Sequence, residues 1–266
     1  MNRIVWLTDI HLNFLPENGL ETLAIEILKS RPDQIWITGD IADSTTLAER
    51  LNRLSELLDR PIRFVLGNHD YYHSSFDAVE RAMDALSCAN PTLHYLTVGG
   101  IQPLSKKVAL LGHDGWADGG YGDFETSTVR LNDYKLIADF KGLEKPALLA
   151  KMRERGGLAA AHFRHYLTHA FKQFEHVYLL THFPPLREAC KFEGHVTSDN
   201  WLPHLANRQA AEVLIELMAA HPHRKLTVLC GHTHHASREV VGGNLEVITG
   251  AAEYRSPTIQ KIIEIP

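Results

Sequence analysis

The sequence predicts an α/β fold built on a largely parallel sheet that helices cover. Short apolar, β-prone runs alternate along the chain with segments whose apolar residues recur at helical spacing. This alternation is typical of βαβ units. A chain of 266 residues, 44% of them hydrophobic, can bury a sizeable core, and we expect residues 1–266 to form a single domain.

Each predicted element follows from the period of its apolar residues. The predicted strands are 3–8, 34–38, 62–66, 108–111, 177–180, 226–230 and 245–249. The predicted helices lie within 20–28, 47–58, 76–86, 163–174 and 214–218. We expect Gly156 and Gly157 to interrupt a longer helical region, because glycine is a poor helix former.

In two long segments the apolar residues follow neither the helical period nor a pattern typical of strands. Residues 112–134 are rich in glycine and aspartate, and residues 187–208 are mixed in composition. Loops of this length in a compact domain are usually functional or disordered. Each segment comes after a predicted strand, so we expect both to lie at one edge of the sheet.

Five of the predicted strands end in side chains that can bind metal ions. In an open α/β sheet, ligands bind outside the carboxyl ends of the strands, so these side chains should converge on one edge. The side chains are Asp9 and His11; Asp40 and Asp43; Asn68, His69 and Asp70; His182; and His232, His234 and His235.

The chemistry of this set suits divalent transition metals. Carboxylate, amide oxygen and neutral imidazole fit Mn, Fe, Zn, Co or Ni, and no cysteine stands at a ligand position. Seven ligands exceed the need of one tetrahedral ion and suit two ions bridged by a carboxylate, as in two-metal hydrolysis of phosphate esters. Glycines at 39, 67 and 231 precede ligands, where we expect them to permit sharp backbone turns.

The order of these motifs resembles the calcineurin-like metallophosphoesterase superfamily. The motifs are D-x-H, GD-x-x-D, GNHD, a histidine that ends a strand, and GHTH, and they extend from residue 4 to about residue 234. No core ligand of the pattern is missing. The resemblance implies a four-layer α/β/β/α sandwich, in which two sheets pack face to face with helices outside.

The resemblance also implies a role for each residue of the motifs. Asp9, His11 and His234 would hold one ion; Asn68, His182 and His232 would hold the other; and Asp40 would bridge them. The ions would be two divalent or trivalent transition metals, such as Mn, Fe, Zn or Ni. A hydroxide bridging them would attack phosphorus in line. His69 would contact the phosphate or protonate the leaving oxygen, and Asp70 would orient or charge-stabilise His69.

The expected substrate is a small-molecule phosphate monoester or diester, cyclic nucleotides included. The net charge of −5 and the pI of about 6.4 give no support to a nucleic-acid partner and weigh against the alternative of a nuclease. A phosphoprotein phosphatase is a third possibility for the enzyme. A non-catalytic protein-interaction scaffold on the same fold is the alternative of a different class. The presence of His69 and of every ligand favours an enzyme.

The remaining features concern location. Three cysteines, an odd number without paired spacing, indicate a reducing compartment. No segment reaches the roughly 18 apolar residues of a membrane span. We therefore expect a cytoplasmic protein without membrane contact.

Several residues near the motifs keep two interpretations. Asp43 either supports the ligands or belongs to the start of the next helix, and His113 and Asp114 either contact substrate or only shape a loop. The aromatic residues of the long loops either stack on substrate or pack the loops down, with packing favoured; they are Trp116, Tyr121 and Trp201. We expect His195 to reach the cleft, His235 to face away and Cys230 to be a buried small hydrophobic residue.

Overall fold

A computed structural model describes residues 2–16 and 18–266 and contains two mixed sheets. The first sheet has the strand order β13-β1-β2-β3-β4, in which the β1–β4 pairings are parallel and β13 pairs antiparallel with β1. Its strands are β1 (Asn2–Leu7), β2 (Gln34–Thr38), β3 (Ile62–Val65), β4 (Leu93–Tyr95) and β13 (Lys261–Ile265).

The second sheet has the order β11-β12-β10-β7-β6-β5. Its four central strands are parallel, and the strand at each edge pairs antiparallel with its neighbour. Its strands are β5 (Gln102–Pro103), β6 (Val108–Gly112), β7 (His176–Leu180), β10 (Lys225–Cys230), β11 (Ser237–Val241) and β12 (Leu245–Thr249).

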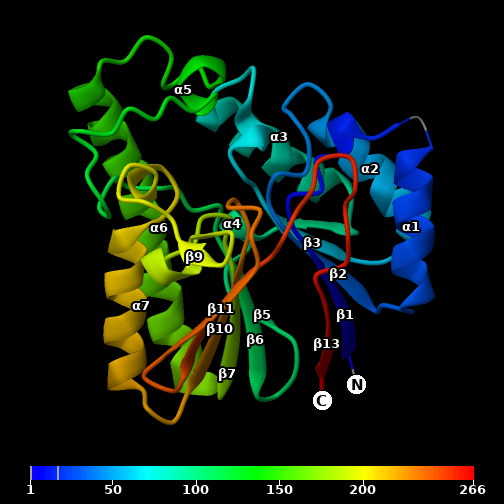
Figure 1. The fold of residues 1–266 in the computed structure, drawn as a ribbon. Coiled ribbons are helices and arrows are strands. Elements are labelled where there is room, and N and C mark those ends of the chain that lie inside the picture. Colours follow the sequence, from blue (N-terminus) through cyan, green and yellow to red (C-terminus); the bar gives the residue numbers. More distant parts are fainter. Residues whose placement is uncertain (1, 17) are drawn as a thin grey trace.

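The two sheets pack face to face, and helices cover their outer faces (Figure 1). Buried side chains such as Trp6 and Trp36 from the first sheet and Leu229 from the second form the layer between them. The helices beside the first sheet are α1 (Gly19–Lys29), α2 (Leu47–Leu58) and α3 (Phe76–Ala89), and those beside the second are α6 (Lys145–Gln173) and α7 (Arg208–Ala220). This arrangement confirms the α/β/β/α sandwich.

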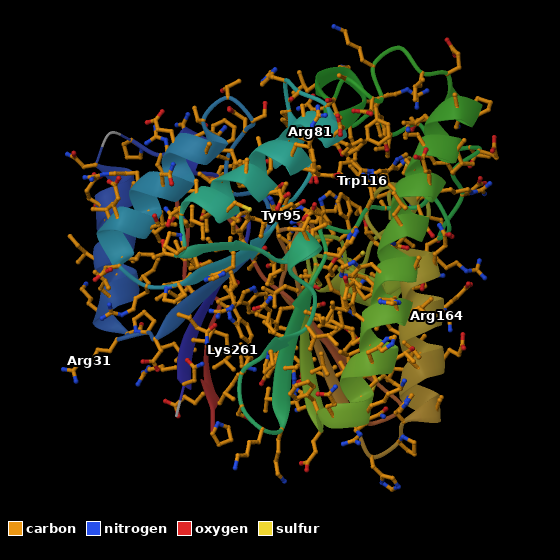
Figure 2. The ribbon with its side chains drawn as sticks, turned by 180° about the vertical axis from the view of Figure 1, so that it is seen from behind. Arg31, Arg81, Tyr95, Trp116, Arg164 and Lys261 are labelled. Carbon is orange, nitrogen blue, oxygen red and sulfur yellow. The ribbon has the colours of Figure 1, made fainter. Side chains whose placement is uncertain are left out.

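The side chains follow the same layering. Figure 2 shows Tyr95 and Trp116 inside the molecule, whereas Arg31 and Arg164 point outward from its helical layers. Every residue of β2 and of β6 is buried, as expected of strands covered on both faces. All seven predicted strands are present, each within one residue of its predicted ends. Buried side chains of the two sheets share one core between them.

The prediction of a break at Gly156 and Gly157 is wrong, because α6 continues through both residues. At this point the helix lies close to a loop: a Cβ atom on Gly156 would stand 2.6 Å from the Cβ atom of Asp118. The missing side chain thus permits close packing, although glycine in a helix costs roughly 1 kcal/mol.

The long loops are more structured than their composition indicates. Residues 187–208 contain a hairpin of β8 (Lys191–Phe192) and β9 (His195–Val196) and the short 3-10 helices Arg187–Ala189 and Leu202–His204. The segment 112–134 runs into the short helix α5 (Asp133–Leu136). The two loops bond to each other, for example from the amide of Asp123 to the carbonyl of Asp199 at 2.9 Å, so they form one continuous rim.

Candidate metal centre

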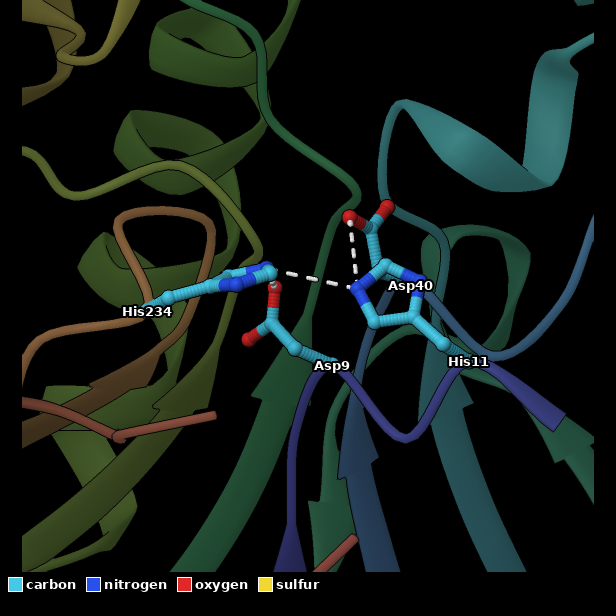
Figure 3. Close-up of side chains that lie close together, drawn as sticks. All are labelled: Asp9, His11, Asp40 and His234. Carbon is cyan, nitrogen blue, oxygen red and sulfur yellow. Dashed lines mark hydrogen bonds and ion pairs between the residues drawn. The ribbon is translucent and has the colours of Figure 1, made fainter. Parts of the chain in front are cut away.

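The strand ends bring all seven expected metal ligands together at one edge of the two sheets (Figure 3 shows four of them). Asp9 and His11 follow β1, Asp40 follows β2 and Asn68 follows β3 in the first sheet. In the second sheet, His182 follows β7, and His232 and His234 follow β10. The sequence predicts that side chains at the ends of parallel strands meet at one edge, and the ligands of both sheets do so.

Four of these side chains form a compact group. One ligand atom from each of Asp9, His11, Asp40 and His234 lies within 4.8 Å of all the others. Nε2 of His11 is 3.3 Å from Nε2 of His234 and 3.9 Å from a carboxylate oxygen of Asp40. Nε2 of His234 is 3.4 Å from a carboxylate oxygen of Asp9. Two ligands of one tetrahedral ion with bonds of about 2.1 Å stand roughly 3.4 Å apart, which matches these spacings.

A second group shares Asp40. Oδ1 of Asn68 lies 3.2 Å from Nε2 of His182 and 2.9 Å from Nδ1 of His232. Nε2 of His182 is also 3.4 Å from Oδ1 of Asp40. Asp40 therefore stands between the two groups, where a bridging ligand would stand.

Hydrogen bonds behind these ligands set which atoms face the centre. Nδ1 of His182 donates to the carbonyl of Thr38 at 2.8 Å, and Nε2 of His232 donates to the carbonyl of His204 at 3.3 Å. Burial lowers the pKa of His182, which keeps its ring neutral. The other ring nitrogens therefore present lone pairs toward Oδ1 of Asn68, which is itself an acceptor. Acceptors that face one another without a proton between them suit a cation, so the residues present fit metal ions.

The backbone at the centre is held in an uncommon conformation. Five of the seven expected ligands have φ in the left-handed region: Asp9 at 49°, His11 at 41°, Asp40 at 50°, His232 at 72° and His234 at 57°. Residues other than glycine adopt such angles at a cost, and they do so mainly at functional sites.

The glycines beside the ligands serve mainly to leave room. A Cβ atom on Gly67 would stand 2.2 Å from Oδ1 of Asp40, and one on Gly231 would stand 2.1 Å from Oδ2 of Asp9. Only Gly39, at φ 86°, also needs the left-handed backbone. The expectation that all three permit sharp turns is thus corrected at Gly67 and Gly231, where close approach is the reason.

Burial and mutual repulsion shape the charges of the centre. Burial, followed by the carboxylates of Asp9 and Asp70, raises the pKa of Asp40 well above its usual value. Burial also acts against ionisation of Asp9, but hydrogen bonding to His234 brings its pKa below the usual value. Burial and the neighbouring His69 lower the pKa of His11 to about 3. Buried carboxyl groups beside neutral imidazoles are a favourable environment for cations.

His69 stands beside the centre at the foot of a cavity of about 780 Å³. Its backbone amide donates to Oδ1 of Asp40 at 2.8 Å, and its Nε2 lies 3.5 Å from the hydroxyl oxygen of Tyr254. Burial, followed by the nearby His182, lowers the pKa of His69 to about 4. The ring of His69 therefore lines the cavity directly beside Asp40.

Asp70 does not make the contact expected with His69. Its carboxylate accepts hydrogen bonds from the amides of Ile41, Ala42 and Gly67 at 2.8 to 2.9 Å, and its side chain is buried away from the His69 ring. Asp70 thus ties together the two loops that carry Asp40 and Asn68. The physical reason is local, because the 3-10 turn over His69–Tyr71 directs successive side chains to different sides.

Three nearby residues that kept two interpretations make structural contacts. Asp43 accepts from the amide and hydroxyl of Thr45 ahead of α2, so it belongs to the start of that helix. His113 packs its buried ring against His162 and Phe163, away from the cavity. The buried Asp114 carboxylate accepts from the amide of Leu66 and from the hydroxyls of Tyr71, Tyr95 and Thr97.

The residues of the long loops divide between packing and the cavity. Trp116 is 2% exposed and packs against other aromatic rings, and Tyr121 packs on a small apolar cluster, as the packing interpretation expects. His195 and Trp201 line the cavity, as does His235, whose ring meets Phe192 rather than facing away. Cys230 is buried, as expected.

Sequence reasoning missed three residues near the centre. Asp133 holds the amide of Asn68, His204 supplies the carbonyl behind His232, and Tyr254 places its ring 4.5 Å from that of His11. Tyr254 follows β12, so its place after a strand end was a usable signal. Asp133 and His204 stand in the long loops, where no pattern marks them.

Comparison with known proteins agrees with this geometry. The family model for calcineurin-like phosphoesterases matches residues 2–236. The chain belongs to the calcineurin-like phosphoesterase family. Membership places it among the metal-dependent phosphoesterases, a dimetal family, and Asp9, His11, Asp40 and His234 form a candidate metal-binding group.

Relatives of known sequence or structure add detail about the fold. An uncharacterized metallophosphoesterase from Campylobacter jejuni is 33% identical over 113 residues, which cover 39% of this chain and only 30% of that protein. A phosphopantetheinyl hydrolase from Mycobacterium tuberculosis superimposes with a TM-score of 0.65 at 16% identity, over 96% of this chain and 90% of that one. A dimetal phosphatase from Danio rerio gives 0.60 at 13% identity, over 96% and 89%.

Within residues 2–16 and 18–266, the structure contains no helix that is both long and apolar enough to span a bilayer.

Proposed function

We propose that this phosphoesterase hydrolyses a small-molecule phosphate ester with two metal ions, held by Asp9, His11, His234, Asn68, His182 and His232 and bridged by Asp40. The observation that carries the proposal is the set of mutually facing acceptor atoms, which hydrogen bonds to Thr38 and His204 fix in place. Two ions bound there would supply a nucleophile from water near neutral pH and would stabilise charge on the phosphoryl oxygens.

The residues of the chain would position the phosphate. His69 stands at the mouth of the centre with its ring toward the cavity, where it can contact the phosphate or protonate the leaving oxygen. Asp40 receives the amide of His69, so the bridging ligand and the phosphate contact are held by one hydrogen bond. Tyr254 packs its ring against the rings of His11 and His234 at the side of the centre that faces the cavity.

The substrate and the location of the protein belong to the same proposal. Monoester and diester substrates use the same ligands, and likeness in fold to a phosphopantetheinyl hydrolase and to a dimetal phosphatase is compatible with either.

All three cysteines are free, which fits a cytoplasmic enzyme. Mn, Fe, Zn or Ni would suit the ligands.

The first experiment is to purify the protein without chelator, measure bound metals, and assay p-nitrophenyl phosphate beside bis-p-nitrophenyl phosphate with added Mn²⁺. We expect near two ions per chain and hydrolysis of at least one ester. Asp40→Asn should weaken both ions together, and loss of only one ion would refute the bridging role. Asp59→Asn is the matched control, because Asp59 is exposed and shares the left-handed backbone of Asp40 at φ 47°. A metal-free, inactive protein would refute the proposal.

A further inference from the structure

The exposed aromatic side chains of this protein gather at the metal centre. In the described part of the chain, four phenylalanine, tyrosine or tryptophan side chains are exposed, and three of them, Phe192, Trp201 and Tyr254, line the cavity at 57%, 44% and 47% exposure. The fourth, Phe14, packs edge to face on Tyr254 with ring centroids 5.3 Å apart. Large aromatic side chains left open to water around a single cavity indicate a ligand site.

The part of the aromatic lining that Phe192 forms belongs to a built element. Phe192 lies on the β8–β9 hairpin, whose two-residue turn places Glu193 at φ 49° and Gly194 at φ 84°, as a tight hairpin turn requires. The amide of Thr197 donates to the carbonyl of Cys190 at 2.9 Å, which closes the base of the hairpin. The hairpin therefore holds the exposed ring of Phe192 at the cavity.

The charges around the cavity disfavour a second anionic group. Lys191 is the one lysine or arginine among the described residues that line the cavity, and its ammonium group already pairs with Glu239 at 3.1 Å. Glu193 and the buried Asp133 add negative charge to the walls. A substrate with further phosphates or carboxylates would find no unpaired lysine or arginine among the described residues of the lining.

We propose that the cavity selects phosphate esters whose organic group carries an aromatic ring and no additional negative charge. The phosphate would lie at the metal centre, and the ring would lie between Tyr254 and the wall of Phe192 and Trp201. A cavity of about 780 Å³ has room for such a group beyond the phosphate. The inference rests on the proposed phosphoesterase function and names the substrate class of that same site.

The test compares three esters of primary alcohols of similar acidity, so that chemical reactivity is matched. They are butyl phosphate, 2-phenylethyl phosphate and 2-(4-carboxyphenyl)ethyl phosphate, replaced by their methyl diesters if the enzyme prefers diesters. We expect kcat/KM for the phenylethyl ester to exceed that for the butyl ester by about tenfold, the usual order for stacking on aromatic side chains. The added carboxylate should remove most of this gain.

Variants test whether Phe192 and Trp201 cause the preference for the phenylethyl ester. The double variant Phe192→Ala/Trp201→Ala should bring the ratio of phenylethyl to butyl kcat/KM towards one, whereas Ile215→Ala, an exposed apolar residue on α7, should leave the ratio as in wild type. The ratio of the inhibition constants of 2-phenylethylphosphonate and butylphosphonate measures the same preference without turnover. The metal content of each variant checks that it is folded.

The outcomes separate the two proposals. Hydrolysis of p-nitrophenyl esters with equal rates for the butyl and phenylethyl esters would overturn the inference and leave the phosphoesterase function intact. A preference that survives in the double variant would overturn the assignment to this wall. No hydrolysis of any ester by metal-loaded protein would overturn the proposed function and the inference with it.

Discussion

The carboxylate of Asp133 accepts a hydrogen bond from Nδ2 of Asn68 at 2.9 Å, and this bond turns Oδ1 of Asn68 toward His182 and His232. The same carboxylate oxygen accepts the hydroxyl of Tyr72 at 2.7 Å. Asp133 comes from a loop distant in sequence and is buried. It therefore sets the direction of an expected metal ligand without facing the ion itself.

Replacing Asp133 should weaken one metal site and spare the other. In Asp133→Ala the amide of Asn68 keeps only its longer hydrogen bond, to the hydroxyl of Tyr72 at 3.3 Å, so the affinity at the site of Asn68, His182 and His232 should fall by roughly 10- to 100-fold. The measurement is metal content per chain after dialysis against graded chelator, where we expect the variant to retain one ion when wild type retains two.

The control for this variant is Asp123→Ala, an exposed aspartate in the same loop that makes no contact with the ligands. It should bind both ions as wild type does. If Asp133→Ala also holds both ions with unchanged affinity, Asn68 is oriented by other means and the role assigned to Asp133 is wrong.

Removal of the His69 ring should distinguish its two possible roles. Among the described residues, no carboxylate lies within hydrogen-bond distance of the ring, since Asp70 faces the backbone and Oδ2 of Asp40 is 3.9 Å away. A general-acid histidine is usually supported by such a partner, so we expect His69 to act mainly as a phosphate contact. In His69→Ala, turnover should fall by about 10²- to 10³-fold while both ions stay bound.

The choice of leaving group tests this role of His69. A phosphate contact should cost the same factor with p-nitrophenyl phosphate and with butyl phosphate. A general acid should matter far more for the butyl ester, because p-nitrophenolate leaves without a proton. A much larger loss with the butyl ester would therefore assign His69 as the acid.

Much of the fold and most of the expected ligands could be predicted from the sequence, because both depend on local patterns. The buried parallel strands are continuous apolar runs, and each ligand stands directly after one of them. A strand such as β13 escaped prediction, since its alternation of buried and exposed residues covers only five positions near the end of the chain. The two-residue strands of the β8–β9 hairpin are shorter than any period can reveal.

The parts of the site that escaped prediction depend on contacts distant in sequence. Asp133 acts on Asn68 across 65 positions, and nothing beside it marks it as a partner. The resemblance assigned Asp70 to His69, yet in the structure its partners are the amides of Ile41 and Ala42. Only the packing of loops on one another decides such contacts.

Trp116 should affect stability and leave substrate choice unchanged, contrary to an interpretation of the loop aromatics as substrate contacts. Its ring is buried among Phe76, Phe140 and Phe183. Trp116→Ala should lower the free energy of unfolding by about 3–5 kcal/mol, the usual cost of removing a large core side chain. Urea denaturation measures this loss, and Trp201→Ala, at an exposed site, serves as the comparison with a small effect.

Activity assays complete the test of Trp116. At a temperature where the variant stays folded, the ratio of phenylethyl to butyl kcat/KM should equal that of wild type. A changed ratio with unchanged stability would place Trp116 in contact with substrate and contradict its burial.

The stability of the protein should fall as the pH falls from about 6.5 to about 4, and His176 should contribute to this change. Burial, followed by the charge of Lys225, lowers the pKa of His176 from 6.5 to about 4, while its Nε2 bonds to the hydroxyl of Thr227 at 3.0 Å. Between those pH values the unfolded chain binds a proton that the folded chain does not, so acid favours unfolding. The contribution of neutral His176 to the stability of the folded state is therefore complete above pH 6.5 and is lost as the pH falls to about 4.

His176→Gln removes the titrating group, so the loss of unfolding free energy between pH 7 and pH 5 in urea titrations should be smaller than in wild type. His223→Gln, on the exposed turn before β10, is the control and should keep the wild-type dependence. Both variants leave the metal ligands intact, and measurement in the presence of chelator separates this effect from metal release. A wild-type pH dependence in His176→Gln would show that His176 takes up its proton as readily in the folded chain as in the unfolded one.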